Sequence, residues 1–276
     1  MKKYFTKLIF FSIFFVSIGS PLKAENVDHE NNLQRARVAF SNQEYTSAIT
    51  IWSKIISSKA SIDIVNESLM NRAKVYVMIS QPTLALIDIN NIKDSSPQYE
   101  FDKSLLRGVI YIQLKQYKLA LTELDNAQIL DPSQHLVYSN RHVAYKGLGK
   151  LEKAKKDLEI ALAMDSSLSN HYNLAVLERL FGNTKNCINL LTSILQSSPE
   201  HLPSIEQRGL CYADANLHEL SIVEMLKVIE IDSYNINALR QLGYSLLSQG
   251  DKQNGVKYFE TASEILLSQG KINEYK

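Results

Sequence analysis

Four arginines in this chain of 276 residues each precede a carboxylate by sixteen residues, and a guanidinium can hold a carboxylate through two parallel N–H donors. The sets are Arg72 with Asp88, Arg107 with Glu123, Arg141 with Asp157, and Arg208 with Glu224. Where leucine replaces the arginine, at Leu174 and Leu242, the residue sixteen positions later is apolar. Arg35, which is followed by Ile51 at that spacing, is the exception. This matching favours structural ion pairs between two neighbouring elements over contacts with a ligand.

A second column of polar residues lies directly before these arginines and leucines. Six of its seven members are primary amides: Gln34, Asn71, Asn140, Asn173, Gln207 and Gln241. One amide offers two N–H donors and one acceptor, which match the C=O and N–H groups of a peptide backbone. The amides could therefore bind another chain, or each could bond its own neighbours or water, and the sequence favours neither.

Motifs typical of catalysis are absent from the sequence: there is no glycine-rich phosphate loop, no His-Glu-x-x-His and no Gly-x-Ser-x-Gly. The six histidines are scattered, and most are expected near helix ends or on exposed positions. Cys187 and Cys211 lack the clustered histidines of a zinc site. Both cysteines occupy apolar positions, which favours buried free thiols, although an exported chain would also allow one disulfide. We expect no catalytic residue, no metal and no cofactor.

The elements that must position these columns repeat every 33 to 37 residues. Seven units start near residues 29, 66, 101, 135, 168, 202 and 236. In the numbering of a unit, the amide column is position 6, the arginine column is position 7 and the acid column is position 23. Positions 8 and 20 are small in thirteen of fourteen cases, with His142 as the exception, and small residues allow two helices to approach closely. Apolar residues recur at helical spacing on both sides of a turn, so each unit is predicted to be two amphipathic helices.

The ends of the chain differ from the repeat. Lys2, Lys3 and Lys7 precede an apolar run over residues 8–18, followed by a small-residue cleavage site that ends at Ala24. This order predicts a signal peptide over residues 1–24, with an uncleaved anchor as the alternative. The whole chain has 30 basic and 29 acidic residues, and residues 1–24 hold four lysines and no acid, so cleavage leaves a net charge of 26 − 29 = −3. A nearly neutral surface without basic runs argues against nucleic-acid binding.

The repeat pattern resembles the tetratricopeptide repeat (TPR) family over roughly residues 29–269. The third unit carries the marks most clearly, in Leu105-Leu106-Arg107-Gly108, Tyr111, Tyr117, Ala120, Leu124, Ala127 and Asp131-Pro132. The resemblance implies an all-α, right-handed α-solenoid of about seven helix-turn-helix units over residues 25–269, with a short polar tail over 270–276. His142 and the glycine at position 20 of the last unit, Gly255, depart from the family pattern. A glycine in mid-helix costs about 1 kcal/mol relative to alanine, so Gly255 is expected to weaken the last unit.

In the TPR family the first helices line a concave groove, where asparagines hold the backbone of an extended peptide. The groove residues that this resemblance implies are Gln34, Arg37, Asn71, Lys74, Val109, Asn140, Val143, Tyr172, Asn173, Gln207, Gln241 and Tyr244. Their mixture of apolar, amide and basic side chains suits an extended segment with apolar side chains and some acidic ones.

We therefore expect an exported scaffold that binds partner proteins or peptides in this groove, in the periplasm or another envelope compartment, and acts in assembly or maturation. We expect no nucleic acid and no small-molecule substrate. The alternative is a self-associating structural protein, a homodimer through its C-terminal helix. Phe259, Ile265 and Leu266 motivate that alternative, because no capping helix follows them and exposed apolar patches often mark association sites.

Overall fold

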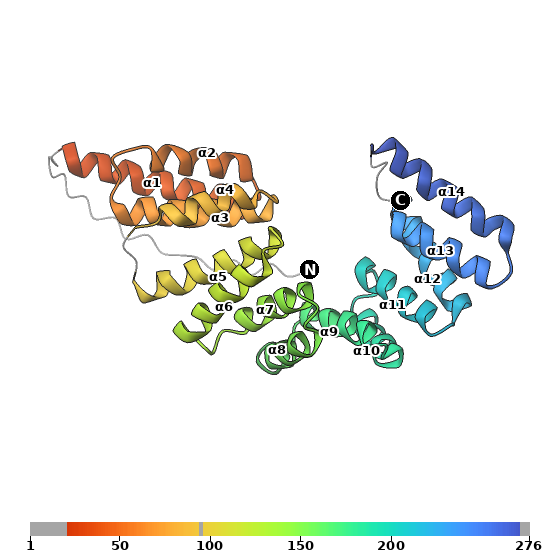
Figure 1. Cartoon of the computed structure of the whole chain (residues 1–276). Coiled ribbons are helices and arrows are strands. Elements are labelled where there is room, and N and C mark those ends of the chain that lie inside the picture. Colours follow the sequence, from red (N-terminus) through yellow and green to blue (C-terminus); the bar gives the residue numbers. More distant parts are fainter. Residues whose placement is uncertain (1–20, 94–95, 271–276) are drawn as a thin grey trace, which may run out of the picture. The chain divides into compact units, whose positions relative to one another are not determined.

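A computed structural model of the chain describes residues 21–93 and 96–270, and every regular element in these ranges is an α-helix (Figure 1). The predicted signal peptide lies outside the described residues except for residues 21–24, which begin the first helix, and the predicted tail does so except for residue 270. None of the described helices is both long and apolar enough to span a bilayer. The chain divides after residue 95 into two compact units.

The first unit consists of two helical hairpins that pack on each other. Its helices are α1 (Pro21–Ser41), α2 (Tyr45–Ile56), α3 (Ile62–Met78) and α4 (Pro82–Asn91). α1 packs on α2, α3 packs on α4, and α2 joins the two hairpins. Trp52 and Ile55 of α2 form the core together with Leu33 of α1 and Val75 of α3. The loop over residues 57–61 between α2 and α3 accounts for the longer period of the first repeat.

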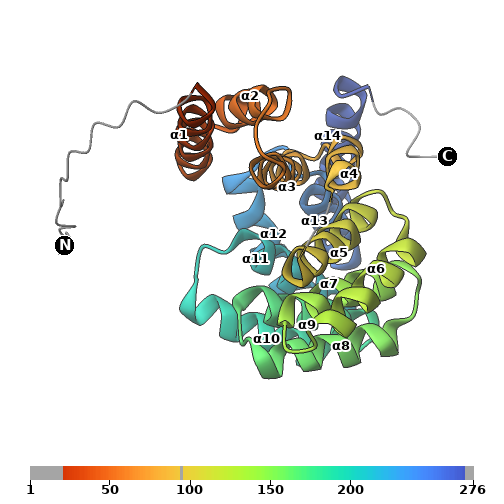
Figure 2. The same ribbon diagram turned by 90° about the vertical axis from the view of Figure 1, so that its left-hand side faces the viewer.

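The second unit stacks five hairpins in the same way (Figure 2). Its helices are α5 (Pro97–Gln113), α6 (Tyr117–Leu130), α7 (His135–Gly147), α8 (Leu151–Met164), α9 (Leu168–Leu180), α10 (Thr184–Ser197), α11 (Leu202–Asp214), α12 (His218–Ile231), α13 (Ile236–Ser248) and α14 (Lys252–Ser268). The second helix of each hairpin packs on the first helix of the next, as Leu158 of α8 does with Leu177 of α9. The last four hairpins begin at the predicted residues, whereas α3 and α5 begin four residues before the predicted starts.

Every hairpin turns through one residue with a positive φ, at position 15 of the repeat. These residues are Gln43, Ser80, Lys115, Gly149, Gly182, Asn216 and Gly250, and their φ angles lie between 57° and 87°. Glycine adopts this conformation without a steric penalty, which explains why Gly149, Gly182 and Gly250 stand in the predicted turns.

The last hairpin shows why position 20 carries glycine there. A Cβ added to Gly255 would lie 3.0 Å from the backbone oxygen of Gly243 and 2.8 Å from Cγ of Leu247. The two helices therefore approach so closely that alanine would not fit without a shift. The expectation that Gly255 only weakens this hairpin through helix propensity is incomplete, because the glycine also permits the close approach.

Two expectations from the sequence are wrong. Cys187 of α10 and Cys211 of α11 are not free thiols: they form a disulfide with a Cα–Cα distance of 6.3 Å. Adjacent hairpins bring the two apolar positions together, which the sequence alone does not determine. Ile265 and Leu266 of α14 are buried rather than exposed, and Ile265 packs with Leu239 of α13.

His135, His171, His201 and His218 lie at or near helix starts, as expected for most of the histidines, whereas His29 and His142 are buried within α1 and α7. His142 is only 1% exposed, at a position where the other hairpins carry a small residue. Burial is the main cause that lowers its pKa to about 4, and the positive charge of Lys146 adds to the effect. His142 is therefore a neutral core residue at neutral pH.

Candidate functional site

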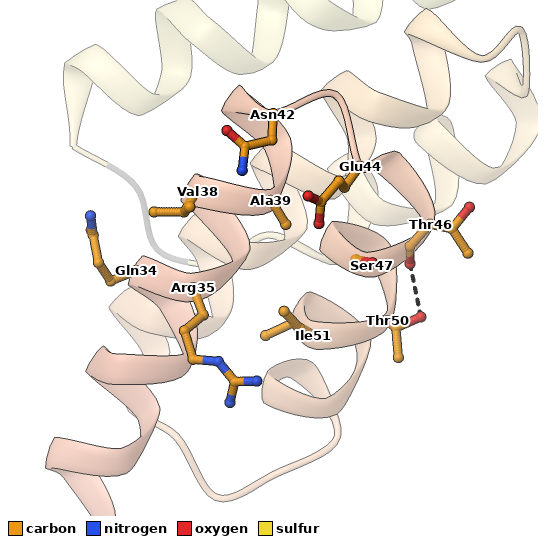
Figure 3. A pocket seen from close by; sticks show the side chains of 10 residues that line it. All are labelled: Gln34, Arg35, Val38, Ala39, Asn42, Glu44, Thr46, Ser47, Thr50 and Ile51. Atoms are coloured by element: carbon orange, nitrogen blue, oxygen red, sulfur yellow. Dashed lines mark hydrogen bonds between the residues drawn. The ribbon is translucent and has the colours of Figure 1, made fainter.

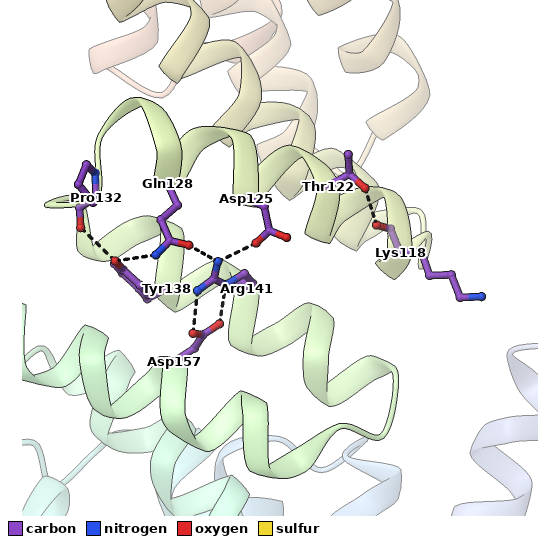
Figure 4. Close-up of polar contacts among 8 residues, drawn as sticks. All are labelled: Lys118, Thr122, Asp125, Gln128, Pro132, Tyr138, Arg141 and Asp157. Carbon is purple, nitrogen blue, oxygen red and sulfur yellow. Dashed lines mark hydrogen bonds and ion pairs between the residues drawn. The ribbon is translucent and has the colours of Figure 1, made fainter.

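Arg141 of α7 shows what the arginine column does (Figure 4). Its Nε and Nη2 donate to the two carboxylate oxygens of Asp157 on α8, at 2.7 and 2.9 Å. Its Nη1 donates to Oδ1 of Asp125 on α6 at 2.7 Å and also to Oε1 of Gln128. Burial opposes the charge of Arg141, but the hydrogen bonds and charges of the two aspartates outweigh it and raise the pKa above its ordinary value. The guanidinium thus joins both helices of its own hairpin to the preceding hairpin.

The structure also brings the other three predicted pairs together. Their shortest N–O distances are 2.6 Å for Arg72–Asp88, 2.6 Å for Arg208–Glu224 and 3.9 Å for Arg107–Glu123. Arg72 also donates to Oγ of Ser53 at 2.6 Å, and Arg208 donates to Oγ1 of Thr192 at 3.3 Å. Ser53, Asp125 and Thr192 all stand at position 25 of the preceding repeat, a column that the sequence analysis missed. These arginines are held by the fold and are structural.

The amides at position 6 do not form one continuous ladder of free groups. Nδ2 of Asn140 donates to the backbone oxygen of Leu136 at 2.7 Å, within its own helix. Nε2 of Gln241 donates to Oγ of Ser245 at 3.2 Å. Gln207 is buried, and its Nε2 has no hydrogen-bond partner. Local bonding, the alternative left open by the sequence, therefore describes Asn140 and Gln241.

In the first compact unit of the chain, the side chains at position 6 also form hydrogen bonds with nearby residues. Glu67 of α3 accepts hydrogen bonds from Nε of Arg37 at 2.8 Å and from Nδ2 of Asn71 at 3.4 Å. Nη1 of Arg37 donates to Oε1 of Gln34 at 3.3 Å, whereas Lys74 is exposed. Glu67 neutralises much of the positive charge expected at this end of the groove. Its role is not visible in the sequence, because its partners lie on two different helices.

The middle of the predicted groove is partly buried. Val109 of α5, Val143 of α7 and Asn173 of α9 are each half-buried. Tyr172 of α9 meets the ring of His201 edge-on, with 6.0 Å between the ring centroids. Burial, followed by the charge of Glu206, raises the pKa of Tyr172 above its ordinary value. These side chains form a wall with few free polar groups.

A hollow of about 500 Å³ lies among α11, α13 and α14, at the end of the predicted groove. It is lined by Leu210, Asn237, Arg240, Gln241, Tyr244 and Phe259. Tyr244 is 54% exposed, and its ring lies edge-on to His218 with 5.8 Å between centroids. Gln241 and Tyr244 belong to the predicted groove set, and Leu210 and Arg240 line the hollow beside them. Asn237 was missed, although it stands one helical turn before Gln241.

The lining of this hollow suits the binding of a ligand rather than catalysis. It combines apolar surface from Leu210 and Phe259 with two amides, a phenol and a guanidinium. It contains no carboxylate, histidine, serine or cysteine that could act as an acid, a base or a nucleophile. The hollow can therefore take an apolar side chain and bond the polar groups next to it.

Solved structures share this architecture. A tetratricopeptide repeat protein from Parabacteroides merdae matches with a TM-score of 0.64 over 86% of this chain and 93% of its own, at 16% sequence identity. The chain has the tetratricopeptide repeat fold. MamA from Desulfovibrio magneticus matches with a TM-score of 0.55, at 16% identity, over 62% of this chain and 97% of its own. The sequence matches no protein-family model and no curated protein.

Proposed function

We propose that this TPR chain is an exported, non-enzymatic scaffold that binds an extended segment of a partner protein along its first helices. The observation that carries the proposal is the hollow among α11, α13 and α14, where the predicted groove residues Gln241 and Tyr244 of α13 line a space together with side chains of α11 and α14. Its lining offers contacts to an apolar side chain and to a backbone but holds no catalytic pair. The fold supports the proposal, because stacked hairpins present extended surfaces that other proteins bind.

The lining also indicates what the bound segment contains. Leu210 and Phe259 suit an apolar side chain, and Tyr244 offers a ring together with a hydroxyl group. Arg240 brings a positive charge to the same hollow, which favours a carboxylate in the segment. The proposed ligand is therefore an extended peptide in which an apolar residue stands close to an acidic one.

Selection of binding peptides from a random library tests this proposal. The purified protein is expected to enrich peptides with an apolar residue near Asp or Glu. Tyr244→Ala should weaken the enriched peptides by tenfold or more, since buried aromatic anchors dominate such contacts. Tyr234→Ala is the matched control, because Tyr234 is also exposed, at 69%, but does not line the hollow. Equal loss of binding in both variants, or none in either, would contradict the proposal.

Export is the second part of the proposal. Two features support it: the order of charge and hydrophobicity over residues 1–24, and the disulfide between Cys187 and Cys211, since disulfides persist in oxidising compartments. Mass spectrometry of the protein from bacterial cells is expected to find a chain that begins at Glu25, in the envelope fraction. A cytoplasmic chain that retains residues 1–24 would refute export without affecting the binding proposal.

A further inference from the structure

Position 10 of the repeat shows what covers each hairpin. In both compact units of the chain, every hairpin after the first has a completely buried residue at position 10. These residues are Val75, Ala144, Leu177, Cys211 and Ser245. Val75 packs with Trp52 and Ile55 of the hairpin before it. At the same position of the first hairpin, Val38 is 48% exposed. Within the described part of the chain, the face of α1 that carries Val38 thus lacks the cover that the interior hairpins have.

The arginine column marks the same face. Arg72, Arg141 and Arg208 each donate to position 25 of the preceding hairpin. Arg35 donates to Oδ1 of Asn32 at 3.2 Å, and it forms no ion pair with any residue that the structure describes. Its own position 23 is Ile51 rather than an acid.

This end therefore presents a positive charge on a surface of mixed apolar and polar side chains. A hollow of about 640 Å³ opens there, lined in part by Arg35, Val38, Ala39 and Ile51 (Figure 3). The hollow is also lined by the carboxylate of Glu44 and by polar side chains, but among the described residues no carboxylate forms an ion pair with Arg35.

The opposite end of the chain carries the complementary stripe. Val256, Glu260, Ser263 and Leu267 follow one another at helical spacing along α14, and all four are exposed, with Val256 at 47% and Leu267 at 59%. Val256 stands at position 21, where Ile49, Leu121, Ile188 and Ile222 are half-buried in earlier hairpins. Glu260 stands at position 25, the position of the acceptors for the arginine column. It forms no ion pair within residues 21–93 and 96–270.

We propose that α14 of one copy docks on the α1–α2 face of a second copy, so that the stack of hairpins continues from one chain into the next. Glu260 then accepts hydrogen bonds from Arg35 as Asp125 does from Arg141, and Val256 and Leu267 cover Val38 and Ile51. The contact joins two different surfaces, so it is heterologous and builds head-to-tail assemblies. It differs from a symmetric dimer of C-terminal helices, for which Ile265 and Leu266 would have to be exposed.

Charge reversal tests this pairing in the purified protein. Sedimentation velocity between about 1 and 200 micromolar, a range in which interfaces of modest size associate, is expected to show a mass that rises above 31.3 kDa, or the slightly smaller cleaved mass. Arg35→Glu and Glu260→Arg should each weaken association by about tenfold or more, because each places like charges opposite one another. Glu264→Arg is the matched control on α14, since it makes the same charge change on an exposed residue outside the stripe.

Mixing the two variants makes the test specific. Equal amounts of Arg35→Glu and Glu260→Arg are expected to recover the wild-type assembly, because every contact between unlike copies then pairs opposite charges. A wild-type chain that stays monomeric over the whole range would overturn the proposal, as would assembly that neither reversal weakens. A mixture that does not recover, while both variants keep their helical circular dichroism, would also overturn it.

Discussion

Lowering the pH is expected to destabilise the α7–α8 hairpin through His142. The unfolded chain takes up a proton at the ordinary histidine pKa of about 6.5, whereas burial lowers the pKa in the folded chain to about 4. Between these values the unfolded state binds more protons. The contribution to stability is therefore complete above about pH 6.5 and is lost as the pH falls towards 4.

The magnitude follows from the two pKa values. The loss is about 2 kcal/mol at about pH 5 and about 3 kcal/mol near pH 4, relative to about pH 7.5. No discount for solvent exposure applies, because His142 is 1% exposed. The free energy lost on protonation of His142 corresponds to about a fifth to a half of the total stability of an ordinary domain.

Urea unfolding of the wild type and of His142→Ala measures this effect. The cost of the alanine cavity is the same at both pH values, so the difference in unfolding free energy between the two proteins isolates the protonation of His142. That difference is expected to shift by about 2 kcal/mol in favour of the variant between about pH 7.5 and pH 5. A difference that does not change with pH would refute the assignment of His142 as a buried neutral side chain.

Three further changes probe the packing, each by urea unfolding. Asp157→Asn leaves a buried guanidinium poorly paired and should cost about 3 kcal/mol, whereas Glu123→Gln, in a long and partly exposed pair, should cost less than about 1 kcal/mol; equal costs would contradict the ranking. Gly255→Ala should lose about 1 kcal/mol, because the clash outweighs the gain in helix propensity, and a net gain would refute the close approach. Reduction of the Cys187–Cys211 disulfide, which closes a loop with a sequence separation of 24, should cost about 3 kcal/mol, and unchanged stability would contradict that bond.

The period of the sequence was enough to predict the hairpins. Small residues at positions 8 and 20 and polar turns between them determine two helices that pack closely, and the spacing of sixteen places the arginine beside the acid of the same hairpin. These features depend on contacts within one repeat, where the sequence separation is short and constant. The paired contact of Arg141 with Asp157 is therefore visible in the sequence.

Contacts between repeats were harder to predict. Asp125 and Thr192 accept hydrogen bonds from arginines of the next hairpin. The role of their position in the repeat can be recognised only once the stacking of the hairpins is known. Cysteines at apolar positions can be free thiols or can form a disulfide, and only the packing of α10 on α11 shows that Cys187 and Cys211 are bonded. The amide of Asn140 could face a ligand or its own helix. The side-chain rotamer, which cannot be read from the sequence, directs the amide to the backbone of its own helix.

Site-specific photo-crosslinking in living cells tests the central claim, that the end of the groove binds a partner protein, most directly. A photoreactive phenylalanine would replace Tyr244 in the hollow or, as the control, Tyr234 outside it. The account predicts a discrete crosslinked product from position 244 that contains a second polypeptide and is absent from position 234. The same products from both positions, or none from position 244, would contradict it.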